Sequence, residues 1–471
     1  MLKHNFRHFP NLRKKFVFVF FSIFLLLFFQ YYFFPSFISM PVLITIVKTE
    51  FIIIYTAALI LSARISGYMS VYTLFLFTSF LFNYSRLFLD YFSDYSITDG
   101  DLFNDIVLSN NSVLELLYLV LFYLLAATLS FLIFYKKSYL NLKQNLFFVR
   151  LGKKIILALA IPLLLLSFLQ LKYILDAGYL SIFNGDALKF KYNALTNLIT
   201  RIVYFGYLLF LSGIPKRKEF IRISLFFISI SFLSALKGQR GSFLLLIVYS
   251  LWYYHNIYNI KFNLFKGLKI TAIILFFSQV IVLVRSSSAS DEVDVLNLPY
   301  EFLRLNGISI MVPAYIIEFK TSLVNNGIPY LFTPIYDYFY RIFIDSQVFY
   351  EGRTNALLTV SNYLSNQLIY FINPPAYYAG MGTGTSYLAE FYDFGGLFLG
   401  SLSLFILIYF IMRWEYFLFS KRAIIFLSPV VVSRFIYMPR DSFFKIINDF
   451  LLLLMVFIFF NFLYKIKIKK L

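Results

Sequence analysis

The 471-residue chain has no cysteine and only three histidines. Without cysteine it can form no disulfide, no thiolate metal ligand and no cysteine nucleophile. The histidines, His4, His8 and His255, all fall in segments that the loop charges place in the cytoplasm, so no serine–histidine pair is expected on the outer face. No phosphate-binding glycine loop or zinc-spaced ligand set occurs, and the pair Asp99 and Asp101 is too weak a motif for a metal. The sequence therefore predicts neither cofactor nor metal.

Charge is also scarce, at 14% of residues, whereas hydrophobic residues make up 60%. A mean hydropathy of +0.77 is more than a soluble fold of this length needs, so the sequence predicts an all-α polytopic membrane protein. The formal net charge is +19, but the basic residues are scattered among short loops between apolar runs. We therefore attribute this charge to orientation in the bilayer and expect no nucleic-acid partner.

Apolar runs long enough to cross ~30 Å of hydrocarbon predict about twelve transmembrane helices. They cover approximately 16–34, 39–61, 68–89, 112–135, 154–175, 196–214, 220–236, 242–258, 268–285, 395–413, 422–438 and 444–464. Basic residues concentrate in alternate loops, whereas the loop after the third run carries Asp94, Asp99, Asp101 and Asp105 and no Lys or Arg. This asymmetry predicts that both termini are cytoplasmic.

The largest loop, 286–394, divides the chain into spans 1–9 (residues 1–285) and spans 10–12 with a cytoplasmic tail (395–471). By the same charge rule this loop lies on the outer face. Two of its segments begin at Pro299 and Pro329 and show helical spacing of apolar residues. Both are expected to be amphipathic helices on the membrane surface.

Two charges interrupt the second run. Lys48 and Glu50 would each cost roughly 2.5–3.5 kcal/mol near the middle of a bilayer. They lie about 200° apart on a helix and so cannot pair with each other. Either the span begins near Lys48 or one of the two faces a polar cavity, and the sequence favours the first explanation.

A glycine- and threonine-rich stretch closes the large loop. Gly382, Thr383, Gly384, Thr385, Ser386 and Tyr387 are its candidate substrate-binding residues, and Glu390 follows them. Alternate glycines let backbone amides approach a ligand closely, and such a segment adds little to packing in a membrane protein. Aromatic neighbours are expected to desolvate the Glu390 carboxylate, which is the candidate catalytic base. The alternative is that Glu390 only stabilises the start of the next helix.

Several cations fall on the predicted outer face, against the orientation bias. Lys237 and Arg240 occupy the short turn between the seventh and eighth runs, Arg285 is the last residue of the ninth run, and Arg341 and Arg353 belong to the large loop. The planar fork of arginine matches phosphate oxygens, so these residues are candidates for binding a fixed anion. Alternatively, a short turn tolerates two charges and loop arginines pair with loop carboxylates.

Three features now occur together: Leu236-Lys237-Gly238-Gln239-Arg240-Gly241-Ser242 at the head of an apolar span, a large outer loop, and Gly382-Thr383-Gly384-Thr385-Ser386-Tyr387-Leu388-Ala389-Glu390 running into the tenth span. In this combination the sequence resembles the bacterial oligosaccharide repeat-unit polymerases, the Wzy family that builds O-antigen and related capsule chains. The resemblance covers roughly spans seven to eleven, and the first half is similar only in hydropathy. Related O-antigen ligases use an outer histidine, which this chain lacks.

The resemblance implies a metal-independent membrane glycosyltransferase of the GT-C type in the bacterial inner membrane. Its donor would be a glycan on undecaprenyl pyrophosphate and its acceptor a single lipid-linked repeat unit, both at the periplasmic face. Arg240 would stabilise the leaving pyrophosphate and Glu390 would accept the proton of the attacking hydroxyl. A chain-length regulator and a flippase of the same pathway are the expected protein partners. A ligase or a lipid-linked oligosaccharide flippase remains an alternative, although a flippase would be expected to show two related halves.

Overall fold

Helices dominate the structure, which is a computed structural model. It describes residues 10–99, 106–137, 141–177, 192–236, 240–260, 298–319, 323, 327–349, 352–418 and 420–469. Within these residues there is no strand, and nine helices are long and apolar enough to cross a membrane. The prediction of an all-α, multi-pass membrane protein is confirmed.

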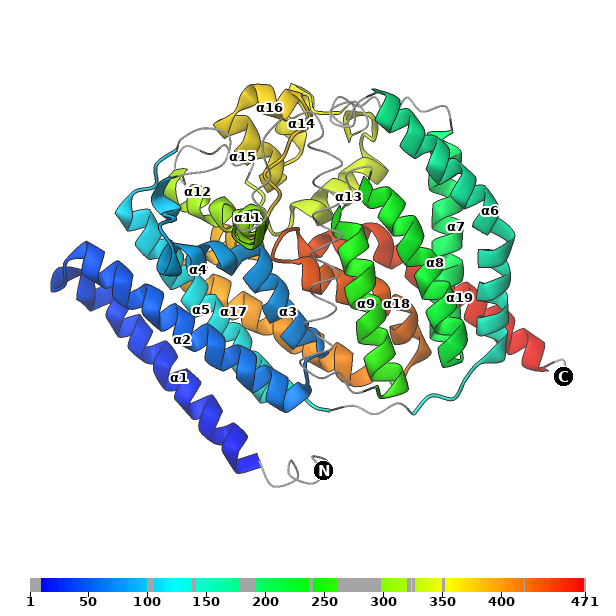
Figure 1. Cartoon of the computed structure of the whole chain (residues 1–471), viewed down its shortest axis with the longest axis horizontal. Coiled ribbons are helices and arrows are strands. Elements are labelled where there is room, and N and C mark those ends of the chain that lie inside the picture. The colour runs from blue at the N-terminus through cyan, green and yellow to red at the C-terminus, as the bar shows by residue number, and fades with distance from the viewer. Residues whose placement is uncertain are drawn as a thin grey trace.

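The first five helices lie together on one side of the molecule (Figure 1). They are α1 (Pro10–Phe33), α2 (Met40–Ser66), α3 (Val71–Ser79), α4 (Ser85–Phe92) and α5 (Asn110–Phe134). A π-helical turn, Phe80–Tyr84, joins α3 to α4. Helix α5 is apolar on every side and packs against α1, α2 and α17, so 94% of its most apolar stretch is buried.

Four helices form a second group: α6 (Leu146–Ala177), α7 (Asn193–Ser212), α8 (Arg217–Leu236) and α9 (Arg240–Tyr258). Helix α6 packs along α7, and α8 packs along α9. Glycine is required where α6 meets α7, because a Cβ on Gly152 would lie 2.4 Å from the carbonyl oxygen of Gly206. The predicted ninth run, 268–285, lies outside the described residues.

The last three long helices are α17 (Tyr387–Leu418), α18 (Arg422–Tyr437) and α19 (Ile447–Lys469). Helix α17 begins at Tyr387, before the predicted start of the tenth span at residue 395, and it is broken at Gly395 and Gly396. Gly396 has a φ of +60°, and its carbonyl accepts a 2.8 Å hydrogen bond from Tyr123 of α5. The glycine pair therefore separates a short N-terminal section of α17, which carries Glu390, from the long apolar section.

Short helices make up the described part of the large loop: α11 (Leu298–Asn306), α12 (Met311–Phe319), α13 (Thr333–Phe343), α14 (Asn355–Val360), α15 (Leu364–Ile372) and α16 (Pro374–Tyr378). Helix α13 exposes Phe339, Ile342 and Phe343, as an amphipathic surface helix should. The surface placement predicted for the first segment is wrong for α12. That helix is apolar on all sides, packs against α5 and α17, and buries Val312 completely.

The charges within α2 are compensated by neighbouring helices. Lys48 Nζ lies 2.6 Å from the carboxylate of Asp90 in α4, and Glu50 accepts a 3.2 Å hydrogen bond from Gln30 of α1. Helix α2 already begins at Met40, so the helix itself does not start near Lys48, and the favoured explanation, that the membrane span starts there, stays a prediction.

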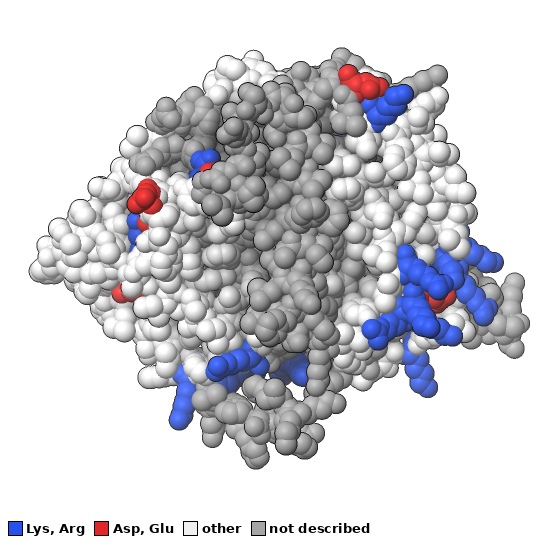
Figure 2. Space-filling model, viewed as in Figure 1, with Lys and Arg blue, Asp and Glu red and all other residues white. Residues whose placement is uncertain are grey.

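Basic residues gather at one edge of the molecule. Figure 2 shows Lys and Arg along the lower edge, where α1 begins and α19 ends in Figure 1. Exposed members at the starts of α6 and α8 are Arg150, Lys154, Lys216, Arg217 and Lys218. Helices α13 to α16 lie at the opposite edge (Figure 1). The charge asymmetry of the loops is thus also an asymmetry of the folded chain.

Candidate functional site

The Gly–Thr segment, defined here as residues 380–386, is non-helical and connects α16 to α17. Gly384 has a φ of +76°, and its N–H donates a 3.1 Å hydrogen bond to Ser365 Oγ of α15. Thr383, Thr385 and Ser386 are buried. The segment is therefore fixed by contacts with the protein rather than extended into solvent.

Arg353 lies directly against this segment. A Cβ on Gly382 would come within 2.8 Å of Arg353 Nη2 and 2.7 Å of Ser365 Oγ, so no larger residue fits there without a shift. Arg353 Nη1 donates to the carbonyl of Met381, and its guanidinium is 5.3 Å from the ring centroid of Tyr377. The structure thus brings together two residues that the sequence singled out separately, Arg353 and Gly382.

The end of the segment is anchored to the π-helical turn. Ser386 donates a 3.3 Å hydrogen bond to Asn83, and the hydroxyls of Tyr387 and Tyr84 are 2.6 Å apart. Both Ser386 and Tyr387 are fully buried, so their side chains serve this junction. π-Helical turns frequently occur at functional sites.

Glu390 lies in the first turn of α17 and is 1% exposed. One carboxylate oxygen accepts a 2.9 Å hydrogen bond from Thr385 Oγ1, and the other accepts a 3.0 Å hydrogen bond from Ser442 Oγ. The carboxylate therefore connects the Gly–Thr segment to residues 438–442, the turn between α18 and α19.

Asp441 in that turn collects donors from three directions. Oδ1 accepts hydrogen bonds from Tyr363 (2.9 Å) and Lys445 (2.7 Å), and Oδ2 accepts one from Arg434 (3.1 Å). Burial alone would raise the pKa of Asp441, but Lys445 and Arg434 more than offset it and leave the pKa below its usual value. The ionised carboxylate holds two cations in place. Sequence reasoning missed this residue, although its position between Arg440 and Lys445 was a signal.

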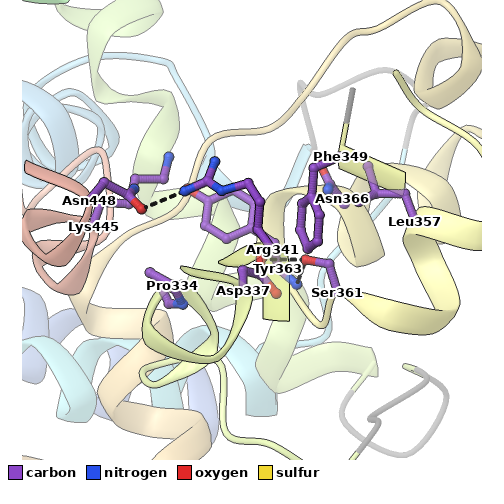
Figure 3. A pocket seen from close by; sticks show the side chains of 10 residues that line it. All are labelled: Pro334, Asp337, Arg341, Phe349, Leu357, Ser361, Tyr363, Asn366, Lys445 and Asn448. Atoms are coloured by element: carbon purple, nitrogen blue, oxygen red, sulfur yellow. Dashed lines mark hydrogen bonds between the residues drawn. The ribbon is translucent and has the colours of Figure 1, made fainter. Parts of the chain in front are cut away.

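A pocket of about 180 Å³ opens beside this cluster (Figure 3). Its lining residues are Pro334, Asp337, Arg341, Phe349, Leu357, Ser361, Tyr363, Asn366, Lys445 and Asn448. Arg341 was predicted and donates a 3.0 Å hydrogen bond to Asn448. Asp337 was missed, although it lies one turn before Arg341 on the same face of α13. Burial raises the pKa of Asp337 to about 6, against smaller opposing effects of Ser361, Arg341 and Lys445.

The start of α9 lies near the same turn. A Cβ on Gly241 would be 2.4 Å from the hydroxyl of Tyr437, at the end of α18, so Arg240 begins a helix that abuts this region. The guanidinium of Arg440 lies 5.3 Å from the ring centroid of Phe82 in the π-helical turn. The side chain of Arg240 and all of Lys237 and Arg285 lie outside the described residues.

The candidate metal pair Asp99 and Asp101 cannot be placed, since Asp101 is likewise outside the described residues. Within the part of the chain that the structure describes, no group of three or more His, Asp or Glu is placed to hold a metal ion.

Taken together, the fold and the site define a multi-pass helical membrane protein in which cations, carboxylates and hydroxyls gather where the Gly–Thr segment meets the turn between α18 and α19. The chain belongs to the O-antigen polysaccharide polymerase Wzy family, whose family model it matches over residues 16–470. The family implies a polymerising activity of the glycosyltransferase kind on lipid-linked oligosaccharide repeat units. The match includes the first half of the chain, where the sequence resembled the family only in hydropathy. No match was found among curated proteins or solved structures.

Proposed function

We propose that this protein joins oligosaccharide repeat units carried on undecaprenyl pyrophosphate at the periplasmic face of the bacterial inner membrane. The observation that carries this proposal is the match to the O-antigen polymerase family over nearly the whole chain. The site supports it, because Arg341 belongs to α13, and α13 to α16 lie at the edge opposite the exposed basic residues of the α6 and α8 starts. By the positive-inside rule those exposed residues would face the cytoplasm.

The charge of the site suits a lipid pyrophosphate. Its described cations are Arg341, Arg353, Arg434, Arg440 and Lys445, and its carboxylates are Asp337, Glu390 and Asp441. Within the described residues Arg353 donates only through Nη1, which leaves the rest of its fork for phosphate oxygens. In this proposal Lys237, Arg240 and Arg285 complete the set.

The donor would bring its own leaving group, so the reaction needs no nucleotide. An acceptor hydroxyl attacks the anomeric carbon of the donor glycan, the bond from that carbon to the pyrophosphate oxygen breaks, and the lipid pyrophosphate leaves with the electron pair. Arg240 and Arg353 would stabilise the charge that develops on it. The proton of the hydroxyl goes to a carboxylate. Glu390 was predicted for this step, but its two hydrogen bonds within the protein favour a positioning role.

The same proposal includes the more detailed properties that the resemblance to the Wzy family implies. The protein would have twelve spans in a GT-C-like arrangement, work without a metal ion, and act beside a flippase and a chain-length regulator. The backbone of Gly382 to Gly384 and the side chain of Thr383 would line the donor site. Thr385, Ser386 and Tyr387 would hold that backbone in place through their buried hydrogen bonds.

Deleting the gene should leave surface glycan with a core capped by a single repeat unit, because flipping and ligation continue while elongation stops. Electrophoresis of surface polysaccharide from cells with and without the gene measures this. Bare core with accumulated lipid-linked polymer would instead indicate a ligase, and bare core without polymer would indicate a flippase.

Single cysteines should report the proposed topology cleanly, because the chain has none of its own. Ser288→Cys and Ser346→Cys should react with an impermeant maleimide in intact spheroplasts, whereas Lys467→Cys should react only after permeabilisation. Positions 288 and 346 come before and after α11 and α12 in the sequence. Because residues 299–319 are apolar enough to cross a membrane, comparing the labelling of these two positions shows whether they do. Labelling of those two positions from opposite sides would show that this segment crosses.

A further inference from the structure

The pocket beside α13 contains a carboxylate, Asp337, to which the steps described above assign no role. It is lined by an aromatic ring (Phe349), an amide (Asn366), a carboxylate (Asp337) and a cation (Arg341) (Figure 3). An apolar ring face beside a few fixed polar groups suits a sugar, whose ring presents both a C–H face and hydroxyls. A volume of about 180 Å³ is on the scale of one sugar ring rather than a whole repeat unit.

Asp337 has one carboxylate oxygen in use and one that is not. Ser361 Oγ donates a 2.6 Å hydrogen bond to Oδ2, whereas Oδ1 is buried and has no hydrogen-bond partner among the described residues. Buried acceptors without a donor are uncommon in folded proteins, and a ligand hydroxyl would supply the missing donor. The charged groups that face Asp337 are Arg341 on its own helix and Lys445 in the 3-10 turn just before α19.

We propose that this pocket binds the acceptor sugar and that Asp337 receives the proton of its attacking hydroxyl. The hydroxyl oxygen forms the new bond to the donor's anomeric carbon, its O–H bond breaks, and the proton moves to Oδ1 of Asp337. The electron pair of the broken donor bond leaves with the lipid pyrophosphate. This assignment rests on the proposed function and names the acceptor side of the same site.

The pocket and the Gly–Thr segment belong to one hydrogen-bonded framework. Tyr363 lines the pocket and donates to Asp441, and Lys445 lies 4.4 Å above the Tyr363 ring. The next residue after Asp441, Ser442, donates to Glu390, which in turn accepts from Thr385. A donor at the Gly–Thr segment and an acceptor in the pocket would therefore be held by the same set of rigid contacts.

The acidity of Asp337 gives the assignment a pH signature. With its pKa raised to about 6 by burial, the carboxylate is ionised at neutral pH and becomes protonated as the pH falls through that value. A base must be unprotonated to act, so elongation should decline below about pH 6 and level off above it.

The test uses membranes from cells that lack the chromosomal gene and carry tagged variants, with their own lipid-linked single repeats as substrate. The initial rate of polymer formation is measured between about pH 5 and about pH 8, at matched protein levels. Asp337→Asn should lower the rate by at least ~10²-fold and abolish the pH dependence. Asp337→Glu should retain a measurable rate with a shifted profile. The matched control is Asp345→Asn, because Asp345 lies just after α13, does not line the pocket, and has a carboxylate that accepts a hydrogen bond from the backbone N–H of Gln347.

An Asp337→Asn protein with the wild-type rate and pH profile would overturn this assignment. If the Asp337→Asn protein fails to accumulate in the membrane, Asp337→Glu provides the test instead. An unchanged pH profile of the Asp337→Glu protein would also overturn the assignment. Failure of the wild-type protein to make polymer from these membranes would be a different result, since it would contradict the proposed function itself.

Discussion

Glu390→Ala should abolish chain elongation, whereas Glu390→Gln should keep it within about tenfold of wild type, since one altered hydrogen bond is worth only ~0.5–1.5 kcal/mol. Alanine leaves the buried hydroxyls of Thr385 and Ser442 without their acceptor, at ~1–3 kcal/mol each, and releases the Gly–Thr segment from the turn after α18. Glutamine keeps the shape and one carbonyl, and the Ser442 hydroxyl can rotate to accept from the amide. Polymer length on gels, normalised to protein level, measures both variants.

Glu415 provides a matched control in the same helix. It is buried at 8% exposure near the other end of α17, where it accepts a 3.3 Å hydrogen bond from the backbone N–H of Val71. Glu415→Gln should elongate like wild type. A fall of at least ~10²-fold in Glu390→Gln at normal protein level, with the control unaffected, would contradict the positioning role and make Glu390 the base that the sequence predicted.

Arg353→Ala and Gly382→Ala should fail to the same extent, by ~10²–10³-fold in elongation rate, which is the usual cost of losing one donor to a developing anionic charge. The first variant removes the guanidinium. The second places a Cβ 2.8 Å from Arg353 Nη2 and pushes the same guanidinium aside. Arg353→Lys should rescue poorly, because lysine lacks the planar fork. Rates on native lipid-linked repeats in isolated membranes give the comparison.

Two controls separate this effect from general damage. Gly327→Ala strains a backbone with a φ of +78° but meets nothing within 4 Å, so it should retain activity. Arg150→Ala removes an exposed cation at the opposite edge and should be neutral. Wild-type elongation by Gly382→Ala would show that Arg353 does not depend on this close approach.

Local sequence was enough to predict where the helices lie, because an apolar run of sufficient length must be a helix in a bilayer, whereas the number of spans stays a prediction. In the described residues, each predicted apolar run coincides with one or more helices. The break in α17 at Gly395 falls where the tenth run was expected to begin. It was harder to predict from the sequence whether a helix lies on the membrane surface or is buried among other helices. The run Met311 to Ile317 is apolar on every side, and periodicity cannot tell such a segment from one lying on the membrane until its neighbours α5 and α17 are known.

The candidate site could be predicted only in part. Glycines, hydroxyls and arginines are unusual in a membrane protein and so could be recognised individually. Their partners could not, because Tyr363 and Asp441 are 78 residues apart and Arg353 and Met381 are 28 apart. Asp337 was missed for the same reason, since its significance comes from a pocket that α13 forms with residues from α15 and α19. The roles of the individual site residues stay predictions.

The most direct test of the account uses the purified protein in proteoliposomes, with lipid-linked single repeats extracted from cells that lack the gene as the sole substrate. If the protein joins lipid-linked repeat units as proposed, the products should lengthen by whole repeat units. One lipid pyrophosphate should be released for each addition, and no nucleotide should be required. Single repeats that stay unchanged in the presence of correctly folded protein would contradict it, as would their movement across the bilayer without any lengthening.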